Sequence, residues 1–240
     1  MWHVSLLIRG GVTRASSVLA RRGDEIAIFD TGMGHHAPLL TAALAAQRLS
    51  PADVTLVFNT HAHPDHSHNN VLFPRARIYG STRDRAWTMA VHAAMARADR
   101  PTAEDVAPFF PEMRPGTYNP RLVQKVLGID KLLWDASRLG SSEQIVPLES
   151  TPVPAGIRVI ETPGHAPYHV SFAIDTGERT VVVCGDALLT LDDQYETPPM
   201  MPPWSLAIYR RSRAQLLTMN AILVPGHDAP FGRATMRSGR

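Results

Sequence analysis

The chain has 240 residues, a formal net charge of +2 and one cysteine, Cys184. This length suits one large domain or two small ones, and we expect a single domain over residues 1–240. One cysteine excludes a disulfide framework within the chain. No apolar run reaches the roughly 18 residues of a transmembrane helix, and the first residues lack the pattern of a signal peptide. The sequence contains no basic block of the kind that is typical of a nucleic-acid-binding arm or a membrane anchor. These features favour the cytoplasm.

The first third of the chain alternates short strands with one helix. Apolar and β-branched runs predict strands at 4–8, 16–20, 25–29, 53–58 and 76–79. A helix is expected over 37–49, because its leucines and alanines share one face and Ser50-Pro51 stops it.

Residues 82–150 differ in composition and predict a helical insertion on the core. They contain an expected helix at about 83–98, several proline-rich segments and a second helix at 121–127. Strand patterns occur at 143–148, 157–161, 169–175, 179–184 and 221–224, with a helix at 205–219 before the last. Strands with helices at intervals indicate a mixed α/β domain, built on two sheets or one large sheet.

The chemistry of the chain centres on the run Thr60-His61-Ala62-His63-Pro64-Asp65-His66, which follows the strand at 53–58 directly. His61 and His63 are two residues apart, so on an extended segment they point the same way and can chelate one ion. Asp65 and His66 follow a bend enforced by proline and can reach a second ion nearby. The alternative is a polar surface loop whose histidines are accidental.

Three more elements place a histidine or an aspartate where a predicted strand ends. They are Thr162-Pro163-Gly164-His165, Cys184-Gly185-Asp186 and Pro225-Gly226-His227. A glycine beside each of these side chains allows the backbone to turn sharply towards a common point. Each element alone is compatible with an ordinary turn, but their combination with the histidine-rich run is specific.

With Asp30-Thr31-Gly32 after an early strand, these motifs resemble those of the metallo-β-lactamase superfamily over nearly the whole chain. The resemblance implies an α/β fold, the four-layer αβ/βα sandwich, with the site in the cleft between two sheets. It also implies two divalent ions. His61, His63 and His165 would bind the first ion, Asp65, His66 and His227 the second, Asp186 would bridge both, and Asp30 would brace the histidine loop. These ligands favour Zn²⁺ and leave Mn, Fe or Co open.

Two ions bridged by a carboxylate imply a hydrolase in which a bridging hydroxide attacks a small ester, lactone or thioester. Asp186 would hold the ions, and Asp65 would pass a proton to the leaving group. Asp186 stands where β-lactamases of this fold commonly have Cys or Ser, which argues against that activity. Leu189 stands where lactonases of the superfamily often have Tyr, which leaves that assignment open.

Three alternatives to this hydrolase remain at this stage. Residues 50–74 and 225–231 are similar to a small single-domain branch of the superfamily that is linked to RNA cleavage, which suggests a phosphodiester nuclease. The run from Gly185 to Leu189 resembles persulfide dioxygenases, which use one Fe. The third alternative is a metal-binding protein without catalysis.

The surroundings of the motifs supply candidates for substrate contacts. His35, His36, His68, His169 and Trp204 lie close to them in the sequence, whereas His3 and His92 have no special context. The expected apolar pocket walls are Trp87, Met89, Met95, Phe109, Phe110, Met113, Trp134, Met200, Met201 and Trp204, with packing onto the core as the alternative. Such walls favour a small-molecule substrate over nucleic acid. Arg210, Arg211 and Arg213 predict a solvated helix face, and the insertion also suits a lid or a homodimer surface.

Overall fold

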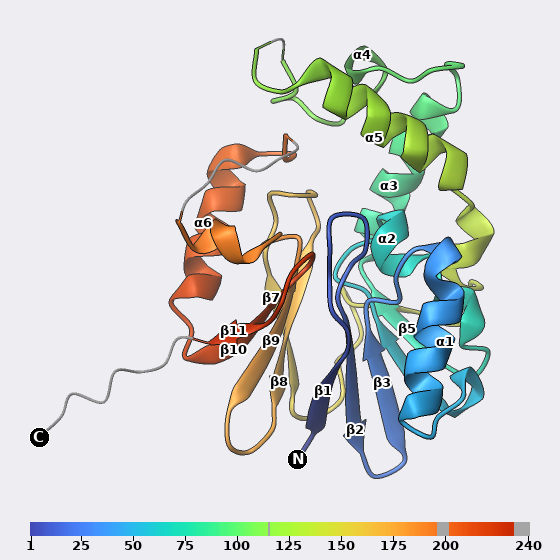
Figure 1. Ribbon diagram of the computed structural model, residues 1–240, viewed down its shortest axis with the longest axis vertical. Helices are drawn as coiled ribbons and strands as arrows, with labels where there is room; N and C mark the ends of the chain where they lie inside the picture. The colour runs from blue at the N-terminus through green and yellow to red at the C-terminus, as the bar shows by residue number, and fades with distance from the viewer. Residues whose placement is uncertain (115, 196–201, 233–240) are drawn as a thin grey trace, which may run out of the picture.

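The computed structural model describes residues 1–114, 116–195 and 202–232. Two β-sheets pack against each other, with helices on their outer faces and above one edge (Figure 1). The first sheet comprises β1 (His3–Ile8), β2 (Ser17–Arg22), β3 (Glu25–Phe29), β4 (Leu56–Phe58), β5 (Arg77–Gly80) and β6 (Ile145–Pro147), in that order. The second has the order β11 (Phe231–Gly232), β10 (Ala221–Pro225), β9 (Thr180–Gly185), β8 (Val170–Asp175) and β7 (Ile157–Glu161).

The parallel parts of the sheets bring the predicted motifs to one edge. Strands β3 to β6 run parallel to one another, and so do β9 and β10. The carboxyl ends of parallel strands meet at the same edge of a sheet, which is where ligands bind in such folds. Asp30 follows β3, Thr60 lies just after β4, and Asp186 follows β9.

An aromatic core lies between the sheets and supports this edge. Phe29 and Phe58 stack at 4.7 Å between ring centroids, and Phe172 of the second sheet meets them edge-on at 5.5 and 5.3 Å. All three side chains are fully buried. Because Phe29 and Phe58 end β3 and β4, this packing fixes the starts of the loops that carry the motifs.

The helices complete four layers. They are α1 (Ala37–Ala46), α2 (Pro64–Ser67), α3 (Thr82–Met95), α4 (Ala103–Val106), α5 (Pro120–Leu133) and α6 (Leu206–Leu217). Leu40 and Leu44 of α1 pack on the outer face of the first sheet, and Leu216 of α6 packs on the second. The order helix, sheet, sheet, helix confirms the predicted α/β sandwich.

Helices α3 to α5 lie above the edge of the sheets (Figure 1) and share a small core of their own. The helical turns of this region end at Leu139, and Ile145–Pro147 pairs with β5, so the helical part stops short of residue 150. Ile129 and Leu132 of α5 are exposed. A homodimer through this insertion stays a prediction.

Several details differ from the sequence-based expectations. Asp65 and His66 lie in a one-turn helix, α2, rather than in a simple bend, because Pro64 suits the first position of a helix. Arg213 is buried and paired with Asp193 at 3.2 Å, so the prediction of a solvated face is wrong for this residue. Met200 and Met201 lie outside the described residues. Within the described ranges, no helix is long and apolar enough to cross a membrane.

Candidate metal centre

Seven side chains from both sheets converge at the edge described above. Their ligand atoms form three overlapping groups, each within 4.8 Å. The groups are His61, His63 and His165; His61, His66 and Asp186; and Asp65, His66 and His227. The structure therefore brings together all seven residues that the sequence predicted as ligands.

Asp186 lies in the middle of the centre, with one oxygen towards each side. Its Oδ2 is 3.3 Å from His165 Nε2 and 4.0 Å from His61 Nε2. Its Oδ1 is 3.1 Å from His66 Nε2 and 3.4 Å from His227 Nε2. The bridging role that the sequence resemblance implied for Asp186 stays a prediction.

Glycines shape the backbone around Asp186. Gly185 has a φ of 51°, in the left-handed region that favours glycine. A Cβ atom on Gly226 would overlap Asp186 Oδ1. The glycines beside the predicted ligands are thus required here, one for its backbone conformation and one for close approach.

Asp30 sets the orientation of two of the imidazoles. Its Oδ1 accepts a hydrogen bond from Thr60 N, and its Oδ2 accepts one from Thr60 Oγ1, both at 2.8 Å. Oδ2 also lies 2.8 Å from His66 Nδ1. Because Thr60 Oγ1 donates to Asp30, its lone pair accepts from His61 Nδ1 at 3.1 Å. Both histidines therefore carry a proton on Nδ1 and turn Nε2 towards the centre.

His169 supports Asp186 and has no nitrogen left for a substrate. It is buried, and its Nε2 accepts a hydrogen bond from the backbone N–H of Asp186 at 3.0 Å. Its Nδ1 therefore carries the proton and donates to Thr162 Oγ1 at 2.9 Å. Ser171 continues the chain of bonds, because its hydroxyl lies 2.9 Å from Thr162 Oγ1 and donates to Cys184 O.

The charges of the centre are opposed and buried. Burial alone would raise the pKa of Asp186, but His66, His227 and His165 hold it well below its usual range. Burial would likewise lower the pKa of His227, but Asp186 and Asp65 raise it to about 10. Burial and the neighbouring His165 lower the pKa of His63 to about 3. Two carboxylates thus face a group of imidazoles of which only some carry a positive charge.

The donor atoms fit a divalent metal ion. His61 Nε2, His66 Nε2 and Asp186 Oδ1 are buried, and none of them makes a hydrogen bond with the described residues. His63 Nδ1 and His165 Nε2 face each other at 3.0 Å. Leaving such atoms unpaired costs free energy, and imidazole with carboxylate is a usual ligand set for Zn²⁺ and other divalent metals.

The other predicted histidines surround the centre at different depths. His35 is exposed, whereas His36 is half-buried, and its Nδ1 makes no hydrogen bond with the part of the chain that the structure describes. His68 is fully buried, and neither ring nitrogen makes a hydrogen bond within the described residues. Its ring lies 5.2 Å from that of Trp134, which stacks on His92 at 3.8 Å and an angle of 3°. His92 therefore has a context that the sequence did not reveal.

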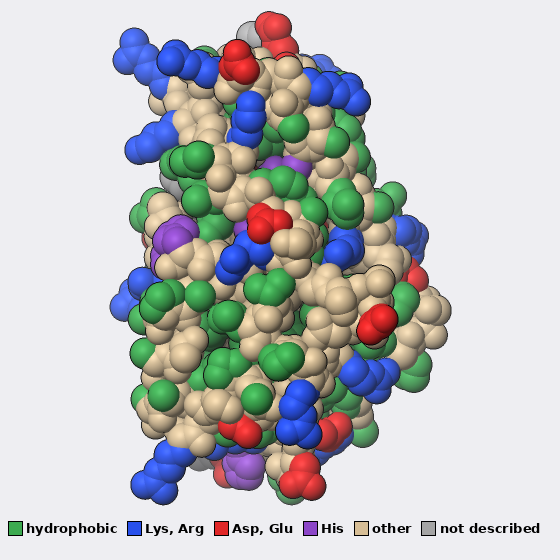
Figure 2. Space-filling view, turned by 90° about the vertical axis from the view of Figure 1, so that its right-hand side faces the viewer, with side chains coloured by type: hydrophobic (Ala, Val, Ile, Leu, Met, Phe, Trp, Pro, Cys, Tyr) green, Lys and Arg blue, Asp and Glu red, His purple; other side chains and the backbone are tan. Residues whose placement is uncertain are grey.

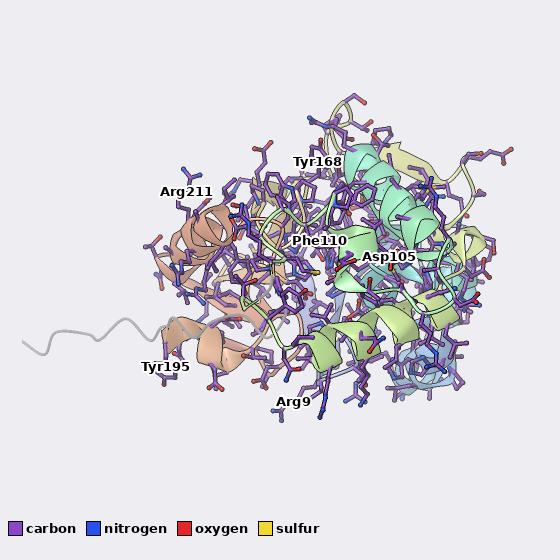
Figure 3. The ribbon with its side chains drawn as sticks, turned by 90° about the horizontal axis from the view of Figure 1, so that it is seen from above. Arg9, Asp105, Phe110, Tyr168, Tyr195 and Arg211 are labelled. Atoms are coloured by element: carbon purple, nitrogen blue, oxygen red, sulfur yellow. The ribbon has the colours of Figure 1, made fainter. Side chains whose placement is uncertain are left out.

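Some of the expected wall residues lie near the centre, and others pack the insertion. Trp87 lies 6.1 Å from the ring of His63, and Phe110 lies 5.2 Å from Trp87. Figure 3 shows Phe110 near the middle of the view from above. Met95 and Met113 are buried in the core of the insertion, so for them the packing alternative holds. Trp204 is half-buried, and its backbone N–H donates to His165 O at 3.0 Å.

Sequence reasoning missed several residues that hold the centre. Asp84 binds the backbone between two of the predicted ligands, and Thr162 and Ser171 anchor His169. Asp193 accepts from the backbone of Leu189 and Thr190, and so holds the loop after Asp186. Each acts on partners distant in sequence, and the only local signal was the position of Asp84 in the first turn of a helix.

Comparisons with known proteins identify the family to which the sequence is similar. A family model described as "Metallo-beta-lactamase superfamily" matches residues 10–227. The curated protein "Metallo-beta-lactamase domain-containing protein 1" of Mus musculus is 29% identical over 215 residues, covering 88% of this chain and 63% of its own length. The chain therefore spans less than two thirds of that relative.

Two solved structures share the fold. A Thermotoga maritima protein described as "a putative metallo-beta-lactamase" superposes with a TM-score of 0.62 at 21% identity, covering 96% of this chain and 99% of its own. AidC, a dizinc quorum-quenching lactonase, superposes with a TM-score of 0.62 at 19% identity, covering 89% and 72%.

Proposed function

Because the chain belongs to the metallo-beta-lactamase superfamily, whose members are typically metal-dependent hydrolases, we propose that it cleaves a small ester, lactone or thioester with two divalent ions, Zn²⁺ being favoured. The observation that carries this proposal is the placement of Asp186. Its two oxygens face two separate groups of imidazoles, at 3.3 Å from His165 and 3.1 Å from His66.

When bound, a pair of divalent ions supplies an activated water and polarises the carbonyl of the substrate. His61, His63 and His165 would hold one ion, Asp65, His66 and His227 the other, and Asp186 both. Asp30 and His169 keep this set oriented before substrate arrives, so binding needs little rearrangement.

Asp65 is the residue best placed to move a proton. Its side chain is 22% exposed, against 5% for Asp186, so it lies at the open side of the centre. His66, together with a hydrogen bond from His227, keeps its pKa below the ordinary value despite burial, so it is a carboxylate at neutral pH. From this position it accepts a proton within the site and passes it to the leaving group.

The wall beside His63 supports an apolar substrate. Trp87 and Phe110 are both half-buried; their rings pair beside His63, and both also pack against the core of the insertion. Such an aromatic pair suits an acyl chain or a ring. RNA would instead require a basic track. On the face in Figure 2 the basic side chains are scattered among acidic and apolar ones, and in Figure 3 Arg211 points outward.

The decisive experiment compares substrates on the purified full chain, loaded with Zn²⁺, Mn²⁺ or Co²⁺ or stripped with EDTA. The panel contains γ-lactones, short-chain aryl esters and thioesters, and a single-stranded RNA. We expect metal-dependent turnover of at least one ester or lactone and little cleavage of RNA. The reverse preference would replace the proposal with a nuclease, and turnover that survives EDTA would refute the metal mechanism.

Two variants assign the roles within this assay. Asp186→Asn and Asp65→Asn should each lower kcat/KM at least about 100-fold, since they remove a ligand or the proton carrier. Asp24→Asn, in the exposed turn between β2 and β3, is the matched control and should retain wild-type turnover.

A further inference from the structure

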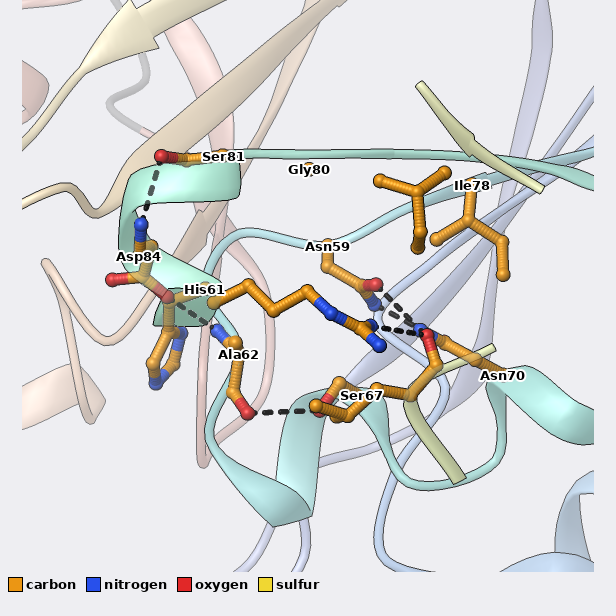
Figure 4. A pocket seen from close by; sticks show the side chains of 12 residues that line it. Asn59, His61, Ala62, Ser67, Asn70, Ile78, Gly80, Ser81 and Asp84 are labelled. Atoms are coloured by element: carbon orange, nitrogen blue, oxygen red, sulfur yellow. Dashed lines mark hydrogen bonds between the residues drawn. The ribbon is translucent and has the colours of Figure 1, made fainter. Parts of the chain in front are cut away.

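Asp84 contacts the metal-binding loop from the first turn of α3. Its backbone N–H donates to the capping Ser81 Oγ at 3.1 Å, and this places the carboxyl group inward. Asp84 is 1% exposed, and its Oδ2 accepts a hydrogen bond from Ala62 N at 2.6 Å (Figure 4). Ala62 lies between His61 and His63, which face one potential ion.

The peptide groups of Ala62 are held from both sides. While Asp84 binds the N–H of Ala62, Ser67 of α2 donates to its carbonyl oxygen at 3.0 Å. The rings of His61 and His63 lie 4.4 Å apart at 71°. Both side chains leave the backbone next to the clamped residue, so the clamp sets their directions relative to each other.

Ordinary helix capping does not explain Asp84. Asp53 and Asp105 occupy the same third position of their helical turns, and each folds back to accept from its own N-cap backbone, at Ser50 and Thr102. Asp84 instead reaches across to a loop 22 residues away. The Asp84 carboxyl group therefore does not complete a capping box and instead binds the loop that carries His61 and His63.

Burying the Asp84 carboxyl group also costs free energy, and an incidental contact would not offset that cost. Asp84 Oδ1 is buried and makes no hydrogen bond with the described residues, and burial raises the pKa of the carboxyl group to about 7. A buried carboxyl group with one unpaired oxygen destabilises a fold, and such groups in native proteins call for a functional explanation.

We propose that Asp84 is a positioning residue of the metal centre, which fixes the Ala62 backbone and thereby presets His61 and His63 for their shared ion. This inference rests on the proposed metal-dependent function. It adds a residue of the helical insertion to the machinery that holds the metal, although Asp84 contacts neither an ion nor the substrate.

The test measures metal binding directly, by titrating the metal-free full chain with Zn²⁺ or Co²⁺ against a chromophoric chelator. Asp84→Ala removes the acceptor for the Ala62 N–H and should raise the dissociation constant of the ion shared by His61 and His63 about 10- to 100-fold. Asp84→Asn keeps an oxygen for the Ala62 N–H and should stay within about threefold of wild type. Asp105→Ala removes a half-buried acid at the same helical position and is the matched control.

The visible spectrum of bound Co²⁺ separates positioning from a general loss of stability, because it reports the geometry of the ligands. We expect saturated Asp84→Ala to show an altered spectrum, with wild-type spectra for Asp84→Asn and Asp105→Ala. Should Asp84→Ala fail to fold, Asp84→Ser replaces it, because a serine hydroxyl is too short to reach Ala62. Wild-type affinity and spectrum in the folded variant would overturn the inference. A wild-type chain that holds no metal would instead refute the proposed function itself.

Discussion

Substituting Asp30 by asparagine should reverse the protonation of two metal-facing imidazoles. In the native protein Asp30 Oδ2 accepts from both Thr60 Oγ1 and His66 Nδ1. An amide with its oxygen towards Thr60 N places an NH₂ group at the Oδ2 position. That group donates where Oδ2 accepted, so His66 Nδ1 becomes an acceptor and its proton moves to Nε2. Thr60 then donates to His61 Nδ1, and the same reversal follows at His61.

The structure sets the size of this effect. For an ion to bind in this variant, its histidine (His61 for one ion, His66 for the other) must move its proton from Nε2 back to Nδ1. This breaks the buried hydrogen bond that Nδ1 accepts, and it leaves the Nδ1–H facing another donor. A buried donor without a partner costs about 1–3 kcal/mol. Each dissociation constant should therefore rise about 5- to 150-fold. The amide oxygen still accepts from Thr60 N, as Oδ1 of the native carboxylate does, so the Asp30→Asn variant should still fold.

The assay is a chelator competition with Zn²⁺ on metal-free protein, together with the thermal midpoint of the same samples. Asp24→Asn serves as the control for loss of one surface carboxylate. Wild-type affinity for both ions in a folded Asp30→Asn variant would refute the tautomer reasoning. If only one of the two ions binds more weakly, the reversal of protonation is restricted to the histidine that binds that ion.

Four further outcomes follow from the geometry. In metal-free protein, burial and, to a smaller extent, the neighbouring His68 lower the pKa of His92 to about 3. The unfolded chain therefore binds a proton at a higher pH than the folded chain does, and the free energy of unfolding falls as the pH falls below the ordinary His pKa of 6.5. His92→Phe should therefore lose about 2–3 kcal/mol less than wild type between pH 7.5 and 4.5 in urea titrations, and equal losses would contradict the shift. Trp87→Ala should lower kcat/KM for long or aromatic acyl esters about 10-fold or more and for acetate esters less than about threefold, and a uniform loss would remove Trp87 from the wall. Gly226→Ala should abolish tight Zn²⁺ binding by displacing Asp186, as isothermal titration would show. With two ions, each present at 100 times its dissociation constant, wild-type protein should lose about 5 kcal/mol of stability on EDTA treatment, and an unchanged thermal midpoint would argue against tight binding.

The sequence predicted the part of the centre that depends on local patterns. Apolar and β-branched runs mark the strands, and the predicted ligands lie in segments that follow a strand, with a glycine or proline directly beside His63, Asp65, His165, Asp186 and His227. Parallel strand ends meet at one edge, so His61, His165, Asp186 and His227 had one place to converge once the resemblance had supplied the ligand set. The α/β sandwich and its superfamily were predictable for the same reason.

The supporting residues were not predictable, because their partners lie far along the chain. Arg213 has the helical spacing of a solvated residue, and its ion pair with the buried Asp193 of another loop accounts for its burial. His92 sits in an ordinary helical sequence, and its stacking partner Trp134 ends a different helix. No local pattern distinguishes such residues from surface residues, since the distinction arises when elements pack.

One turn of α3 connects the helical insertion to the metal centre. Asp84 and Trp87 lie three residues apart on α3, a spacing that places side chains on neighbouring positions of one helix face. Asp84 holds the loop between His61 and His63, while Trp87 lies 6.1 Å from the ring of His63. The distance between the aromatic wall and the metal ligands is therefore set by one rigid turn. We therefore expect a change in α3 that moves Trp87 to move His61 and His63 as well, and so to alter the proposed substrate preference and metal affinity together.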